Sequence, residues 1–159
     1  MSDDTQQMVF SIEKLYVKDM SLEVPGAPQV FMQPEQPQLE VQIEHQVTAI
    51  DEAMFEVALI ITVSAKSGEK TLFLVEVTQA GIFQIRNIPE DSIGPILGIV
   101  CPNTLFPYAR EAISDAVTRA GFPPVVLQPV SFETLYQQRL AEQQAAGGGD
   151  DGPRIQIAH

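Results

Sequence analysis

The first half of the chain alternates apolar and polar residues in a pattern that predicts a β-sheet. In residues 39–47, leucine, valine and isoleucine alternate with glutamate and glutamine. This period of two is typical of a strand with one face in water. A second alternating run covers residues 54–65, and a third covers residues 70–83. The turns between these runs are too short for a parallel crossover. We therefore predict an antiparallel meander.

Residues 9–24 form another strand-like segment, but the phase of its apolar residues shifts along the way. Phe10 and Ile12 belong to one alternation, and Leu15 and Val17 belong to the next, as a β-bulge would require. The following segment, residues 25–37, contains four prolines whose spacing rules out a helix and a central strand. It is predicted to be an extended connection that carries apolar side chains.

After residue 89 the periodicity becomes that of helices. A short helix is predicted over residues 91–100 and a stronger one over residues 105–120, with the Cys101-Pro102 pair interrupting the pattern between them. The three prolines between positions 123 and 129 predict an extended connector. Ser131 is then expected to cap a last helix.

Together these elements predict one α+β domain, an antiparallel sheet followed by helices. The domain covers residues 9–142, with a flexible N-terminus at residues 1–8 and a disordered polar tail at residues 143–159. With 159 residues, the chain is large enough to bury a core without metals or disulfides.

The chain is acidic and apolar at once. Its formal net charge is -12 and 45% of its residues are hydrophobic, so it lacks the low hydrophobicity of a disordered acidic chain. The negative charge repels nucleic acid and anionic lipid and favours basic partners. An ordinary solvated surface would explain the excess of acidic residues equally well. The N-terminus lacks the basic and apolar regions of a signal peptide, and no apolar run is long enough to span a membrane. We predict a soluble, cytoplasmic protein.

Residues suited to catalysis or cofactor binding are scarce. His45 continues the strand register of residues 39–43 and His159 ends the polar tail, so neither is predicted to be a base or a metal ligand. Cys101 lies in an apolar stretch, which favours a buried, inert thiol. No glycine-rich loop with a lysine opens a helix, so no nucleotide site is predicted. A spatial pair of carboxylates stays open, but we predict no enzyme activity, no cofactor and no metal.

The second half of the chain contains the unusual run CPNTLFPYARE, from Cys101 to Glu111. Together with Gly81-Ile82-Phe83, Gly121-Phe122-Pro123 and the strand around residues 73–77, this run closely resembles the SecB family of preprotein-export chaperones. The resemblance extends over roughly residues 9–140, which is essentially the whole predicted domain.

The resemblance implies an α+β subunit with a four-stranded antiparallel sheet and C-terminal helices, assembled as a dimer of dimers. It implies an ATP-independent molecular chaperone in protein export, which binds unfolded precursor proteins in long apolar grooves and keeps them translocation-competent. It further implies that an acidic face docks on the SecA translocation ATPase, whose zinc-containing C-terminal segment is basic. The predicted meander, the acidity and the missing nucleotide site agree with this family.

The resemblance also assigns residues to these surfaces. SecA contacts of the family fall on Asp19, Glu23, Leu74 and Glu76. The other face of the last strand, which the family would use as an oligomer interface, carries Phe73, Val75 and Val77. Large apolar residues of the connections and helices are candidates for the substrate groove, while core packing stays open as the role of each: Phe31, Met32, Ile82, Phe83, Phe106, Tyr108, Phe122 and Tyr136.

One position departs from the family pattern. Glu35 stands where many relatives carry tryptophan, and the sequence contains no tryptophan, so their substrate preference does not carry over directly. The tail after Leu140 does not match closely either. Two other functions stay open: a SecB-like chaperone dedicated to one antitoxin, and a non-catalytic oligomeric scaffold that binds folded partners.

Overall fold

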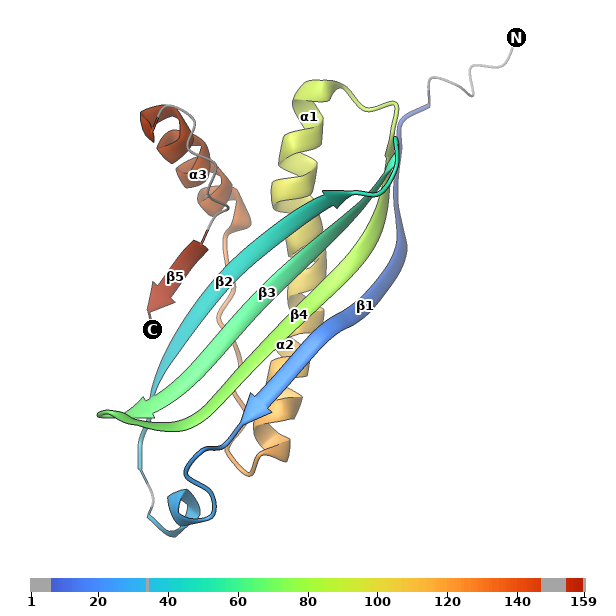
Figure 1. Cartoon of the computed structure of the whole chain (residues 1–159). Coiled ribbons are helices and arrows are strands. Elements are labelled where there is room, and N and C mark those ends of the chain that lie inside the picture. The colour runs from blue at the N-terminus through green and yellow to red at the C-terminus, as the bar shows by residue number, and fades with distance from the viewer. Residues whose placement is uncertain (1–6, 34, 147–153, 159) are drawn as a thin grey trace.

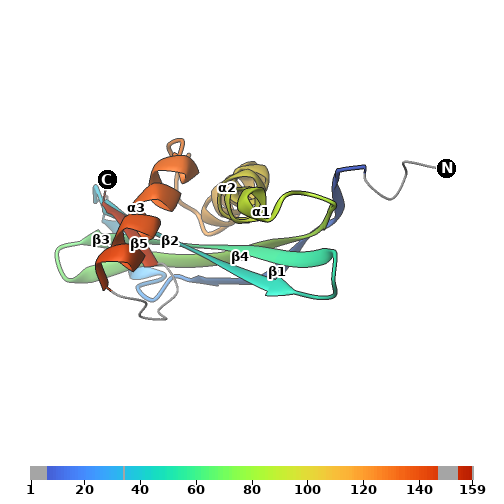
Figure 2. The same cartoon turned by 90° about the horizontal axis from the view of Figure 1, so that it is seen from above.

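The structure is a computed structural model that describes residues 7–33, 35–146 and 154–158. It contains one antiparallel sheet with helices on one face (Figure 1; Figure 2). The sheet order is β1-β4-β3-β2-β5, with β1 Val9–Glu23, β2 Gln38–Ala49, β3 Met54–Ser67, β4 Lys70–Arg86 and β5 Arg154–Ala158. The helices are a 3₁₀ helix Gln29–Met32, α1 Glu90–Pro95, a π-helical segment Ile96–Val100, α2 Cys101–Arg119 and α3 Phe132–Ala146.

The predicted sheet and C-terminal helices are confirmed for the single chain. β2, β3 and β4 form the meander, and β1 pairs with the outer edge of β4. The register of β1 shifts twice, between Ile12 and Lys14 and between Val17 and Asp19, in the segment where the apolar phase predicted a bulge. Each extra residue restores the alternation, so the apolar side chains along β1 face the same side of the sheet.

The antiparallel register divides β4 into a covered face and an open face. Phe73, Val75 and Val77 are at most 2% exposed. They form one buried cluster with the apolar stripe of α2, which consists of Leu105, Ala109, Ile113, Ala116 and Val117. Leu74 and Glu76 alternate with them and are half-buried. Figure 2 shows α1 and α2 on one side of the central strands. Leu74 and Glu76 alternate with the residues that this layer covers, so they lie on the open side.

This arrangement corrects the predicted oligomer interface. The resemblance assigns Phe73, Val75 and Val77 to a contact between subunits, but within the single chain they are core residues that α2 already covers. The alternation indicated an apolar face correctly; the layer that covers this face is α2 of the same chain. Burying each such side chain contributes roughly 1.5–3 kcal/mol, which holds the helix layer on the sheet.

The helical part differs from the prediction at Cys101-Pro102, where a break was expected. α1, the π-helical segment and α2 form one continuous rod (Figure 1). A wider π-helical turn directly precedes Pro102, and in it the N–H of Cys101 donates to the carbonyl oxygen of Ile96, five residues back. The proline therefore changes the hydrogen-bond pattern without ending the helix.

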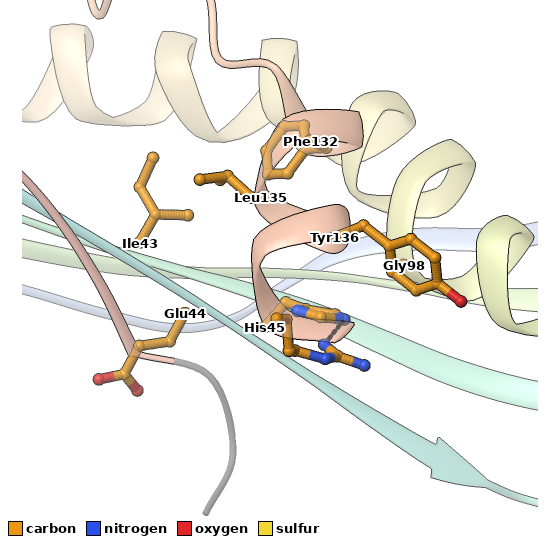
Figure 3. Close-up of a pocket in the computed structure, with 8 residues that line it drawn as sticks. Ile43, Glu44, His45, Gly98, Phe132, Leu135 and Tyr136 are labelled. Carbon is orange, nitrogen blue, oxygen red and sulfur yellow. Dashed lines mark hydrogen bonds between the residues drawn. The ribbon is translucent and has the colours of Figure 1, made fainter. Parts of the chain in front are cut away.

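α3 is anchored by a few contacts near its start. Phe132 is buried, and the ring of Tyr136 lies so close to the rod that a methyl group added at Gly98 would stand 2.5 Å from its Cδ2 atom. Arg139 donates a hydrogen bond through Nη1 to Nε2 of His45 on β2, at 3.3 Å (Figure 3). His45 thus has the structural role that its strand register predicted.

The end of the chain has more regular structure than expected. A disordered tail is predicted from residue 143, but α3 continues to Ala146 and residues 154–158 form β5 on the outer edge of β2. A strand edge presents unpaired N–H and C=O groups, which a further strand can satisfy. The remaining tail residues and residues 1–6 lie outside the described part of the chain.

We predict that the contact between His45 and α3 makes the fold sensitive to mild acid. Burial, and secondarily the charge of Arg139, lower the pKa of His45 from 6.5 to about 4. Because the unfolded chain then takes up a proton below pH 6.5 and the folded chain does not, stability falls as the pH drops through this window. Urea unfolding at fixed protein concentration should show a loss of about 2 kcal/mol between pH 7 and pH 5 from this group.

The matched control is His45→Gln, which keeps an acceptor for Arg139 but does not titrate. This variant should lose about 2 kcal/mol less than the wild type over the same pH interval. Parallel losses in the two proteins would show that His45 does not cause the effect.

Candidate functional site

An open groove of about 750 Å³ lies between the two proline-rich connections and the start of β4. Its walls are mainly apolar, and Phe31 and Phe122 from the predicted set both line it. The other apolar lining residues are Val30, Pro37, Leu39, Leu72, Phe73, Pro123, Pro124 and Val125. Figure 1 shows the first connection beside the C-terminal end of α2. We call this feature the apolar groove.

Three aromatic rings connect the parts of the apolar groove. The ring centroid of Phe122 lies 5.3 Å from that of Phe31 and 5.0 Å from that of Phe73. Gly121, with a φ of +95°, makes this meeting geometrically feasible, because the chain must turn sharply after α2. A Cβ atom at this position would also stand 3.0 Å from the ring of Phe31. Glycine therefore serves both the turn and the aromatic contact.

One ionisable side chain lines the apolar groove. Glu35 Oε1 lies 4.0 Å from Lys70 Nζ, and Glu35 Oε2 is buried without a hydrogen-bond partner among the described residues. Tryptophan at this position would have extended the aromatic wall. In this chain the wall instead carries a carboxylate, so the groove is less aromatic here than the family pattern predicts.

The other predicted groove residues lie elsewhere. Phe83 is buried and stacked on Phe10, and Phe106 is buried with its ring edge-on to that of Phe132. Both are core residues of the chain and do not line the apolar groove. Met32 is 79% exposed beside the groove but does not line it. The last three lie apart from it: Ile82 on the open face of β4, Tyr108 exposed on α2, and Tyr136 in a small cavity under α3 (Figure 3).

Sequence reasoning missed several lining residues that are not aromatic. Pro123, Pro124 and Val125 follow α2, and Leu39 and Leu72 belong to the sheet. The proline-rich spacing of both connections was the available signal, because extended segments without strand partners leave room between them and the sheet. That a residue is aromatic does not by itself show whether it is buried in the core or lines a groove.

The predicted SecA contacts gather on the open side of the sheet. Glu23 pairs directly with Leu74, Ser21 with Glu76, and Asp19 with Thr78, so these side chains share one face. Since no helix of the described part of the chain covers this side of β1 and β4, we call it the outer face (Figure 2). The structure therefore brings Asp19, Glu23, Leu74 and Glu76 to one face of the sheet. The alternation in the sequence had placed Leu74 and Glu76 on a common face, and the resemblance added Asp19 and Glu23.

Not every carboxylate on the outer face is available to a partner. Glu56 receives hydrogen bonds from Lys18 and from the hydroxyl of Tyr16, and these bonds lower its pKa. Burial and the same carboxylate raise the pKa of Tyr16 to about 12. Among the described residues, Asp19, Glu23 and Glu76 have no comparable ion pair. Lys18 thus offsets the negative charge of Glu56 within the chain, whereas Asp19, Glu23 and Glu76 have no cation paired with them among the described residues.

β1 also carries an apolar stripe on its other face. Phe10, Ile12, Val17, Met20 and Leu22 are between 36% and 49% exposed, because α2 lies over the central strands and makes little contact with β1. We call these residues the β1 stripe. β1 is also the outermost strand on its side of the sheet, so its free backbone edge lies beside the stripe.

The described residues provide little for catalysis. Burial raises the pKa of Cys101 to about 12, which disfavours the reactive thiolate. No group of three His, Cys, Asp or Glu side chains in the described ranges could hold a metal ion. Within those ranges, too, no helix is both long and apolar enough to cross a membrane.

Comparison with known proteins gives a consistent result. The family described as preprotein translocase subunit SecB matches residues 3–143. Protein-export protein SecB of Dechloromonas aromatica is 58% identical over 144 residues, which cover 91% of this chain and 95% of that protein. The protein of the same name from Chromobacterium violaceum is 60% identical over 141 residues, covering 89% and 94%. That of Nitrosospira multiformis is 52% identical over the full length of both chains.

The fold has a solved counterpart as well. A SecB-like chaperone of Mycobacterium tuberculosis, solved in complex with an antitoxin peptide, superposes with a TM-score of 0.64 at 19% identity, covering 76% of this chain and 90% of that one. This likeness concerns the fold. The family match and the sequence relatives go further, and the chain belongs to the SecB family of protein-export proteins.

Proposed function

We propose that this protein is an ATP-independent export chaperone, which holds unfolded precursors in the apolar groove and delivers them to the SecA ATPase from the outer face. The observation that carries the proposal is the presence of two unlike surfaces on opposite sides of one sheet. One is an open apolar groove, and the other is a face on which Asp19, Glu23 and Glu76 have no ion pair within the described ranges. Membership of the SecB family supports both assignments.

The apolar groove suits an unfolded polypeptide better than a small molecule. It is wide and open, its walls are apolar, and its rim is made of extended backbone outside the sheet. An unfolded chain offers apolar side chains and unsatisfied peptide groups, which such a rim can accept in many registers. Binding of this kind needs neither a shaped pocket nor nucleotide energy.

The outer face suits a basic partner. Its carboxylates are part of the chain's net charge of -12. A cationic protein surface is therefore attracted at long range and contacts these acidic side chains when it binds. The family resemblance supplies the partner's identity, the SecA ATPase with its basic C-terminal segment. Leu74, which pairs directly with Glu23 and lies next to Glu76 on the same face, adds an apolar contact to the charged patch.

For the dimer of dimers we place one interface on the β1 stripe. With Phe73, Val75 and Val77 buried inside the chain, the β1 stripe is the exposed apolar surface that lies next to a free strand edge. A second copy of β1 could pair along this edge and cover the stripe in the same step. We expect cytoplasmic tetramers to be built on this contact.

The two rival functions have less support. The antitoxin-bound structure is only 19% identical to this chain, whereas relatives named as protein-export proteins are 52–61% identical. A scaffold for folded partners would not explain an open apolar groove, and it would not affect the refolding of other proteins.

Precursor holding is tested by refolding. The purified protein should delay the refolding of a denatured precursor without ATP, and Phe31→Ser should weaken precursor binding by about tenfold because an apolar wall of the groove is lost. Met32→Ser is the matched control, since Met32 is the next residue and is exposed outside the groove. No delay at any ratio would favour the scaffold, and equal effects of the two variants would remove the groove from the mechanism.

SecA docking is tested by charge reversal. Glu76→Lys should weaken SecA binding more than tenfold while precursor binding is retained, because it replaces attraction by repulsion at the centre of the outer face. Calorimetric titration with SecA measures the effect. Glu52→Lys in the β2–β3 turn has the same charge change away from the outer face and should alter affinity little. Unchanged affinity in Glu76→Lys would contradict the docking site.

Assembly through the β1 stripe is tested on one strand. Met20→Glu places a carboxylate in the proposed interface and should shift the protein to smaller species in light scattering. Ser21→Glu adds the same charge on the outer face of β1 and should leave the assembly unchanged. Equal molecular masses for the wild type and both variants would place the interface elsewhere.

A further inference from the structure

β3 contributes a hydroxyl group to the centre of the outer face. Thr62 is the direct cross-strand partner of Glu76, and its Oγ1 donates a hydrogen bond to Glu76 Oε2 at 3.1 Å. Both side chains are half-buried, so the bond is partly shielded from water. The residue opposite Glu76 on its other side, in β1, is Ser21. Glu76 therefore stands between two small polar residues.

The surroundings of Glu76 differ from those of Glu56 on the same face. Glu56 has both carboxylate oxygens engaged, one by Lys18 at 2.7 Å and the other by Tyr16. Glu76 receives one neutral hydrogen bond on Oε2, and among the described residues it has no cationic partner. Thr62 thus fixes one oxygen of Glu76 without cancelling its charge.

Fixing a carboxylate matters for a docking contact in water. An exposed ion pair is weak largely because both long side chains must be ordered when it forms, which costs conformational entropy. A side chain that is already held in place has met much of that cost before binding. Threonine is a suitable holder, because its branched side chain has few rotamers in a strand.

We infer that Thr62 is a positioning residue of the SecA-docking surface, which holds Glu76 in its binding geometry and extends the functional patch from β1 and β4 onto β3. This inference rests on the proposed docking of SecA on the outer face. The ordinary role of Thr62 would be that of a good strand former whose hydrogen bond only stabilises the sheet. The two roles differ in whether SecA affinity depends on the hydroxyl through Glu76.

Three single variants separate these roles. Thr62→Val removes the hydroxyl but keeps the shape and strand propensity, and it should weaken SecA binding about fivefold in calorimetric titration. Thr62→Ser restores a donor and should bind within about twofold of the wild type. Thr78→Val is the matched control, since Thr78 lies on the outer face two residues further along β4. Light scattering and precursor binding should be the same for all three.

A double-mutant cycle with Glu76→Gln completes the test. If Thr62 acts through the carboxylate, Thr62→Val should cause little further loss in the Glu76→Gln background. An undiminished fivefold loss in that background, or equal affinities for Thr62→Val and Thr78→Val, would overturn the inference while leaving SecA docking intact. Failure of the wild type to bind SecA would instead overturn the proposed function.

Discussion

The antiparallel register of β3 and β4 is the constraint on which the rest of the structure depends. It sends alternate side chains to opposite faces, so that Phe73 and Val75 are buried under α2 while Leu74 and Glu76 stay open. A shift of one residue would bury the carboxylate and expose the core. The fold is therefore stable only in the register that also assembles the outer face. Stability and the proposed docking surface come from the same pairing.

The apolar groove arises where this two-layer arrangement ends. α2 stops at Arg119, Gly121 turns the chain, and the following prolines cannot continue the helix or join the sheet. Phe73 lies at that limit, packed in the core on one side and in contact with the ring of Phe122 on the other. The groove thus needs no separate scaffold, since it is an incompletely covered end of the core.

The sequence predicted the strands and their local geometry better than it predicted which elements pack against each other. Alternation gave the strands and correctly put Glu76 on an open face, and the phase shift in β1 gave the bulge. Alternation could not show whether α2 or another subunit covers Phe73, because either layer requires the same apolar residues on that face of β4. Phe83 and Phe106 were mistaken for groove residues for a related reason: an aromatic residue carries no mark of which cavity it fills. The π-helical turn before Pro102 has no simple sequence signal.

Under the proposed function, the placement of the two surfaces determines how delivery works. Phe73 in the groove and Leu74 on the outer face are consecutive residues, yet they point to opposite sides of one sheet. A precursor in the groove therefore does not obstruct a partner on the outer face, and both can be bound at once. Because β4 is paired on both sides, neither ligand needs to repack the strand. Delivery then follows from simultaneous binding, with the precursor held near SecA at high local concentration.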